Sequence, residues 1–277
     1  MHYKIKYVLF FIALYFVGFI GGALFFSYYE PELEIKQHSV EDNENINYKE
    51  SEAIDDLYYG DKKEEKNQYK EEGKYDEKET KVGEDKIAYL TFDDGPSKNI
   101  TPKILDILSE NSIKATFFVT GEMAENNEKI IKDIKNRGHS IGNHSYSHDF
   151  NVIYSSIENF TYEVERTEKI LKSILGEDYR SEFFRFPGGS FENYKNPYKK
   201  VLEKINMKYI DWNALNGDAE YHEVPLEAQL QKIKETVKGK KEVVILLHDS
   251  STKSTTLEAL PHIIDYLKNE GYQFKKL

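Results

Sequence analysis

Short apolar runs alternate with helical patterns from residue 86 onward, and this alternation constrains the fold more than any other feature of the chain. The clearest helical pattern covers residues 157–175, where Phe160 and Val164 belong to one apolar stripe. Strands that alternate with helices are typical of a parallel sheet covered by helices. The sequence therefore predicts an α/β fold for residues 85–277, with strands at residues 87–92, 115–119, 140–142, 183–186, 209–212, 243–247 and 273–274.

An uncharged apolar run covers residues 7–26, which is long enough to cross the ~30 Å hydrocarbon core of a bilayer. Lys4 and Lys6 precede it and acidic residues follow it, so the positive-inside rule puts the first residues in the cytoplasm. We expect residues 1–27 to form a cytoplasmic tip and a single-pass membrane anchor, with the rest of the chain outside the cell. The alternative is a cleaved signal peptide, which would leave the same domain secreted.

Residues 28–84 carry about ten of the eleven net negative charges of the chain and have no sustained apolar face. We interpret them as an acidic, disordered linker. The domain that follows is nearly neutral and offers no basic stripe, which argues against nucleic acid as a partner. Cysteine is absent, so disulfides and cysteine-based metal sites are excluded. No protein partner can be inferred.

Two adjacent carboxylates, Asp93 and Asp94, stand at the end of the first predicted strand and precede a Gly-Pro turn. Adjacent strand residues point to opposite sides, but the twist at a strand end could bring both toward one pocket. One carboxylate could then bind a metal while the other serves as a base. The alternative is an ordinary Asp-Gly turn.

His144 and His148 follow the third predicted strand. Residues four apart lie on one face of a helical turn, so two imidazoles could share one cation. Together with one carboxylate they would leave a tetrahedral zinc ion one open position, which is the catalytic arrangement. The alternative for each histidine is a structural role, which we also assign to His139, His222 and His262.

Three further polar clusters follow later strands. Arg185 precedes a glycine-rich turn whose backbone amides, such as that of Gly188, could approach a substrate oxygen. Trp212, the only tryptophan, could be a wall for a sugar ring or a core residue, with Asp218 just beyond it. His248 ends a buried run and could act as an acid or base, or be structural.

Taken in order, the five clusters resemble the motifs of the polysaccharide deacetylases, carbohydrate esterase family four, also called the NodB homology domain. The segments read T-F-D-D-G-P, G-N-H-S-x-x-H, R-x-P-G, D-W with a later aspartate, and L-L-H-D. The resemblance spans residues 86–277. It implies a distorted (β/α) barrel and a hydrolase that acts on linear amides by removing acetyl groups.

The resemblance also implies roles for single residues. Asp94, His144 and His148 correspond to the ligands of one divalent metal ion, with Zn²⁺ as the first choice and Co²⁺ or a similar ion as the alternative. Asp93 corresponds to the general base, which takes a proton from the attacking water. Arg185 corresponds to the arginine that orients this base.

The remaining roles concern the leaving group and the acetyl group. His248 matches the general acid that protonates the leaving amine, and Asp218 matches the carboxylate that holds its ring. The backbone amide of Gly188 would stabilise the developing oxyanion. Leu246 and Trp212 would form the pocket for the acetyl methyl group.

The third motif departs from the commonest form of the family, R-x-R-P-P-Y-G. Phe183, Phe186 and Gly188 stand in place of arginine, proline and tyrosine. A backbone donor survives the change from tyrosine to glycine, but the aromatic surface offered to a sugar does not.

The expected substrate is an N-acetylated polysaccharide, with peptidoglycan N-acetylglucosamine first, because an anchored domain on a linker faces its own cell wall. The alternatives within the family are chitooligosaccharide, poly-N-acetylglucosamine and O-acetylated xylan. A non-catalytic glycan-binding protein is the alternative from another class.

Overall fold

The computed structural model describes residues 86–277, which fold around one sheet in which every strand pairing is parallel. Its strands are β1 (Lys86–Asp93), β2 (Thr116–Val119), β3 (Ser140–Asn143), β4 (Phe183–Phe184), β5 (Lys208–Tyr209), β6 (Ala214–Leu215), β7 (Glu242–His248) and β8 (Tyr272–Lys275).

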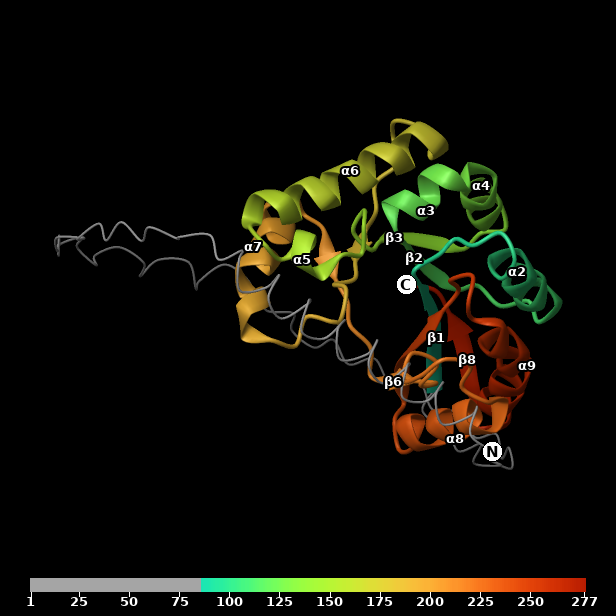
Figure 1. The fold of residues 1–277 in the computed structure, drawn as a ribbon. Coiled ribbons are helices and arrows are strands. Elements are labelled where there is room, and N and C mark those ends of the chain that lie inside the picture. The colour runs from blue at the N-terminus through green and yellow to red at the C-terminus, as the bar shows by residue number, and fades with distance from the viewer. Residues whose placement is uncertain (1–85) are drawn as a thin grey trace, which may run out of the picture. The chain divides into compact units, whose positions relative to one another are not determined.

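The longest strand, β1, lies at the centre of the sheet (Figure 1). The strand order is β5-β4-β3-β2-β1-β7-β6, and β8 pairs with the first half of β1. The register places Asp93 beside His248 of β7 and Phe118 of β2. Because all these strands run the same way, the polar residues that follow them gather at one edge of the sheet.

Helices connect the strands and cover the sheet (Figure 1). They are α2 (Thr101–Glu110), α3 (Gly121–Asn126), α4 (Glu128–Asn136), α5 (Phe150–Ile153), α6 (Ile157–Leu175), α7 (Asn196–Lys204), α8 (Leu226–Val237) and α9 (Ser254–Asn269), with one 3₁₀ turn, η1 (Asn193–Lys195). The helix predicted at residues 157–175 has the bounds of α6. Its N-cap residue Ser156 accepts a hydrogen bond from the Asn159 N–H, and Gly176 ends it with a φ of 107°.

Two apolar clusters make up the core. The larger one joins β1, β2 and β7 to the helices that cover them, with Leu90 and Phe92 fully buried. The smaller one packs Phe160 of α6 against Phe184 and Phe186. It supports the chain segment that follows β4, which carries the third polar cluster.

The two strands predicted at residues 183–186 and 209–212 are shorter than expected, and the strand β6 was missed. β4 ends at Phe184, although the Arg185 N–H still donates to the Asn143 carbonyl. The chain then enters a turn in which Pro187 has no N–H to donate and Gly188 has a φ of 73°. Two-residue strands such as β6 have too few residues to show an alternating pattern.

The predicted barrel is confirmed in part. No pairing within residues 86–277 joins the outer strands β5 and β6 to each other, so the sheet remains open between them. The fold is a curled, parallel half-barrel rather than a closed (β/α) barrel.

The predicted membrane anchor and acidic linker, residues 1–27 and 28–84, lie outside the described residues. Within residues 86–277, no helix is long and apolar enough to cross a membrane.

The imidazole of His139 lies in the core, where only 1% of the residue is exposed. Its Nδ1 accepts a hydrogen bond of 3.1 Å from the Ala115 N–H, and the Phe117 ring meets its ring edge-on. Burial, aided by the positive charges of Lys114 and Arg137, lowers the pKa of His139 to about 4. His139 is therefore structural, as expected, and stays neutral in the folded protein.

This burial makes stability depend on pH. Between pH 6.5 and 4 the unfolded chain binds a proton at His139 that the folded chain does not, so the free energy of unfolding should fall as pH falls. From pH 7 to pH 5 we expect this group to contribute a loss of about 2 kcal/mol. Urea unfolding of wild type and His139→Asn, which keeps an acceptor for Ala115, would measure it. An equally steep pH dependence in the variant would contradict the assignment.

Candidate active site

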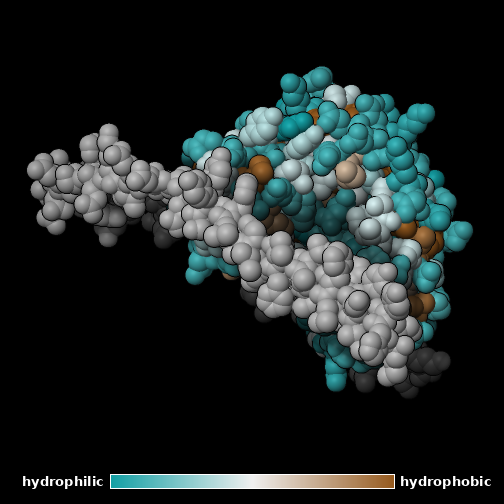
Figure 2. All heavy atoms as spheres, viewed as in Figure 1, coloured by the Kyte–Doolittle hydropathy of each residue, from teal (hydrophilic) through white to brown (hydrophobic). Residues whose placement is uncertain are grey.

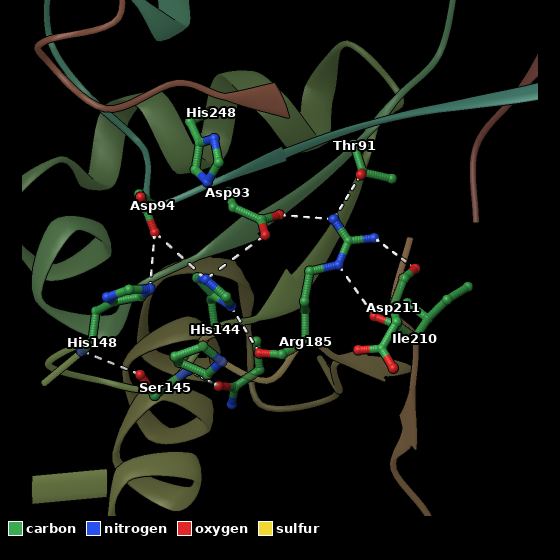
Figure 3. A network of polar contacts seen from close by, with 12 residues as sticks. Thr91, Asp93, Asp94, His144, Ser145, His148, Arg185, Ile210, Asp211 and His248 are labelled. Carbon is green, nitrogen blue, oxygen red and sulfur yellow. Dashed lines mark hydrogen bonds and ion pairs between the residues drawn. The ribbon is translucent and has the colours of Figure 1, made fainter. Parts of the chain in front are cut away.

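The two carboxylates at the end of β1 reach the same site from adjacent residues. Asp93 is the last residue of β1, and Asp94 has a φ of 74°, in the left-handed region. This conformation turns the chain sharply, so that both side chains face the histidines of the second cluster (Figure 3). The sequence predicted that the twist at the strand end could bring both carboxylates to one pocket. In the structure the left-handed conformation of Asp94 does this.

Asp94, His144 and His148 offer ligand atoms that all lie within 4.8 Å of one another. Asp94 Oδ1 is 3.5 Å from His144 Nε2 and 3.3 Å from His148 Nε2. The same Oδ1 atom is buried without a hydrogen-bond partner. One carboxylate and two imidazoles form a donor set that suits Zn²⁺ or a similar divalent ion, so these residues fit the metal that the resemblance implies.

The hydrogen bond of His144 determines which ring nitrogen faces the cluster. Its Nδ1 lies 2.7 Å from the carbonyl oxygen of Arg185, which only accepts, so Nδ1 carries the proton. The lone pair of Nε2 then points at Asp94 (Figure 3).

The two histidines do not lie on a helical turn as the spacing suggested. Residues 144–149 form an irregular loop in which Ser145 and His148 have φ values of 66° and 56°. The buried carboxylate of Glu163 accepts hydrogen bonds from the backbone N–H groups of Tyr146 and Ser147, at 3.0 and 2.7 Å. The loop thus brings the rings within 5.0 Å, centroid to centroid, without helical geometry.

Arg185 is fully buried and joins three segments at the sheet edge. Its guanidinium donates to Asp93 Oδ1 at 2.9 Å and to Thr91 Oγ1 at 2.6 Å, and its Nε donates to the Ile210 carbonyl at 3.1 Å. The central carbon of the guanidinium, Cζ, lies 4.1 Å from the centre of the Phe118 ring. Burial lowers the pKa of Arg185 while the Asp93 carboxylate opposes this change. The geometry holds Asp93 in one orientation (Figure 3).

His248, at the end of β7, forms a pair with Asp218. Its Nδ1 is 2.7 Å from Asp218 Oδ1, and its backbone N–H donates to Oδ2. Thr256 also donates to Oδ2. Although burial works against the charged ring, Asp218, with smaller contributions from Asp94 and Asp93, raises the pKa of His248 to about 9. The ring is therefore protonated at neutral pH.

The glycine-rich turn after Arg185 is held from below. The buried ammonium of Lys195 donates to the carbonyls of Pro187 and Gly189, and Tyr154 donates to Pro187 as well. The carboxylate of Asp211 accepts hydrogen bonds from the Ser190 N–H and hydroxyl. These bonds fix the backbone on both sides of the predicted oxyanion donor, Gly188.

The two residues predicted to line an acetyl pocket lie beside these groups. Trp212 is half-buried, with its ring 5.9 Å from the Arg185 guanidinium. Leu246 is on β7, opposite Thr91 in the register. All ten predicted site residues therefore occupy the carboxyl-end edge of the sheet or the loops beside it. His222 and His262, to which the sequence assigned no site role, are exposed.

Thr91, Phe118 and Lys195 contribute to the site and were missed in the sequence. The position of Thr91 could have been inferred, because residues two apart on a strand share a face and Asp93 follows Thr91 at that spacing. Phe118 reads as an ordinary buried strand residue. Lys195 lies in a charged stretch and is buried only because the turn presents carbonyls to it.

Comparisons with known proteins agree with this geometry. The sequence profile of the polysaccharide deacetylase family matches residues 80–210. A peptidoglycan-N-acetylglucosamine deacetylase from Bacillus cereus is 32% identical over 195 residues, which is 69% of each chain. A peptidoglycan-N-acetylmuramic acid deacetylase from Bacillus subtilis is 30% identical, over 70% of each chain.

A solved carbohydrate esterase family four enzyme from Streptococcus mutans superposes with a TM-score of 0.66 at 35% identity, covering 69% of this chain and 86% of that one. The half-barrel, the five clusters at its edge and these likenesses lead to one conclusion. The chain belongs to the polysaccharide deacetylase family, and its enzyme class is that of a polysaccharide deacetylase.

Proposed function

We propose that this chain is a metal-dependent hydrolase that removes N-acetyl groups from peptidoglycan N-acetylglucosamine and releases acetate. The observation that carries the proposal is the meeting of three potential ligands with a carboxylate held by a buried arginine. Asp94 Oδ1 faces two imidazoles, and Asp93, the neighbouring residue, is bound to Arg185 at 2.9 Å. In this arrangement Asp94 would bind the metal ion, while Asp93 would remain available as the base.

Asp94, His144 and His148 would hold the divalent ion, for which Zn²⁺ is the first choice. When bound, such an ion polarises a carbonyl group and makes water a better nucleophile at neutral pH. Asp93 would take a proton from the attacking water, and Arg185 would keep its free oxygen directed at that water.

The developing charge on the acetamide oxygen would be stabilised by the Gly188 backbone N–H, in a turn that Lys195 and Asp211 hold rigid. His248 would donate its proton to the leaving amine. Its Nδ1–H is engaged by Asp218, so Nε2 is the atom that would deliver the proton. Leu246 and Trp212 would surround the acetyl methyl group.

Peptidoglycan is the preferred substrate for two reasons. The relatives from Bacillus are named for peptidoglycan N-acetylglucosamine and N-acetylmuramic acid, and they match over about two thirds of their length. We further propose that residues 7–26 anchor the protein in the cell membrane, with the domain outside and facing the wall. Other acetylated glycans share the chemistry, and purified polymers would separate them.

The first test measures acetate released from peptidoglycan and from N-acetylglucosamine oligomers, with wild type and Asp93→Asn. We expect the variant to lose about 10²–10⁴-fold in kcat, because the neutral amide cannot accept the proton. Asp265→Asn, at an exposed position of α9, is the control and should retain full activity. Unchanged acetate release by Asp93→Asn would contradict its role as base.

The ligand set predicts one divalent ion per chain. Replacing His148 by alanine removes one of three ligands, so Zn²⁺ affinity should fall at least ten-fold. Competition with a chromophoric chelator measures the affinity without any substrate. His222→Ala, at an exposed histidine that is not among the three potential ligands, should bind as tightly as wild type. Equal affinity of the His148 variant would remove His148 from the ligand set.

The pair of His248 and Asp218 predicts the alkaline side of the pH profile. His248 loses its proton as the pH rises through about 9, so kcat/KM should fall above that pH. Asp218→Asn removes the negative charge that raises the pKa of His248, so the alkaline limb of the profile should move to lower pH. Rates from pH 6 to 10 would show it. A limb that stays in place would mean that another group controls it.

A further inference from the structure

Three of the large exposed aromatic side chains in residues 86–277 surround the glycine-rich turn of the active site. Phe150 is 45% exposed, Phe191 is 61% exposed and Tyr194 is 55% exposed. The surface of the described part is otherwise mostly hydrophilic in the view of Figure 2, where hydrophobic residues form small separate patches. Exposed rings beside a catalytic site are typical of a ligand-binding surface.

The Phe150 ring occupies the space of a side chain at position 188. A Cβ atom added to Gly188 would lie 2.8 Å from the Phe150 ring, too close for any real contact. The same ring meets the potential metal ligand His148 edge-on, with centroids 5.6 Å apart, and meets Tyr154 at 5.8 Å. The Phe150 ring therefore lies between the potential ligand His148 and the turn.

The next glycine of the turn has a matching partner. A Cβ atom on Gly189 would overlap the Phe191 ring, and it would lie 3.2 Å from Trp212. Phe191 and Trp212 meet edge-on with centroids 5.4 Å apart. Both glycines have positive φ values, 73° and 79°. The turn therefore has one ring on its His148 side and one on its Trp212 side.

We propose that Phe150 and Phe191 are the sugar-binding surfaces of this enzyme, and that Phe150 supplies from α5 the aromatic surface that Gly188 lacks. The inference rests on the proposed function and names its substrate contact. A pyranose ring has a face of C–H bonds that packs flat on an aromatic ring, while its equatorial polar groups remain in water. The ligand class is a chain of β-linked N-acetylhexosamines, bound across the turn.

The two rings are specificity-determining residues rather than catalytic ones. They carry no proton donor or acceptor, so their loss should weaken binding of the glycan and leave the chemical step largely intact. In kinetic terms, KM for a tetramer of β-1,4-linked N-acetylglucosamine should rise, while kcat should stay within about two-fold of the wild-type value.

The binding experiment uses the full chain carrying Asp93→Asn, so that bound glycan is not consumed. Calorimetric titration with a tetramer of β-1,4-linked N-acetylglucosamine gives Kd. Combined with Asp93→Asn, either Phe150→Ala or Phe191→Ala should raise Kd about three- to ten-fold above that of the Asp93→Asn parent. Phe150→Tyr in the same parent should keep the parent's affinity. Tyr162→Ala, at an aromatic residue of α6 that is 57% exposed, is the matched control and should not change Kd.

Two measurements keep the outcomes distinct. Zn²⁺ content and thermal midpoint of each variant show whether truncation beside His148 has disturbed the ligands, and Phe191→Ala tests the surface from the side away from them. Binding that neither truncation weakens, or that Tyr162→Ala weakens as much, would overturn the inference alone. No binding and no acetate release by the parent chains would overturn the proposed function, and this inference with it.

Discussion

The buried ion pair between Arg185 and Asp93 is the contact on which the rest of the site depends. A guanidinium with no exposed surface is tolerated only if its charge and donors are satisfied, since an unpaired buried charge costs several kcal/mol. Arg185 meets this demand by drawing β1, β4 and the segment after β5 toward one point. The position of the proposed base is thus a consequence of satisfying the arginine.

The same arginine reaches the ligand cluster through its backbone. Its carbonyl accepts a hydrogen bond from His144 Nδ1, so one residue orients the proposed base with its side chain and a proposed ligand with its main chain. The proposed base and one proposed ligand are consecutive residues, Asp93 and Asp94, and the left-handed conformation of Asp94 turns the chain between their side chains. Small displacements of β4 relative to β1 would therefore disturb both functions together.

Much of this site could be predicted from the sequence because its chemistry sits at strand ends. The long strand β1 and the helix α6 carry strong periodic patterns, and α6 has a serine cap and a terminal glycine. The Asp93-Asp94 and His144-His148 clusters follow such strands directly. Their grouping follows from parallel pairing, which the alternation of elements already implies.

The parts that could not be predicted depend on contacts between distant segments. Asp94, Ser145 and His148 adopt left-handed conformations although none of them is glycine. The loop that contains Ser145 and His148 is held by hydrogen bonds to the distant Glu163. The burial of Lys195 likewise depends on carbonyls that the turn presents. The open edge of the sheet lies between β5 and β6, which have two residues each. Strands this short show no alternation of apolar and polar residues in the sequence.

The contact between Gly188 and Phe150 has a consequence for how the family varies. A side chain at position 188 would overlap the end of the Phe150 ring, so that ring would have to move or be replaced by a smaller side chain. A substitution at one position therefore affects the other. In relatives with tyrosine at the position of Gly188, we expect a smaller or differently oriented side chain at the position of Phe150, although 37 residues separate the two positions in the sequence.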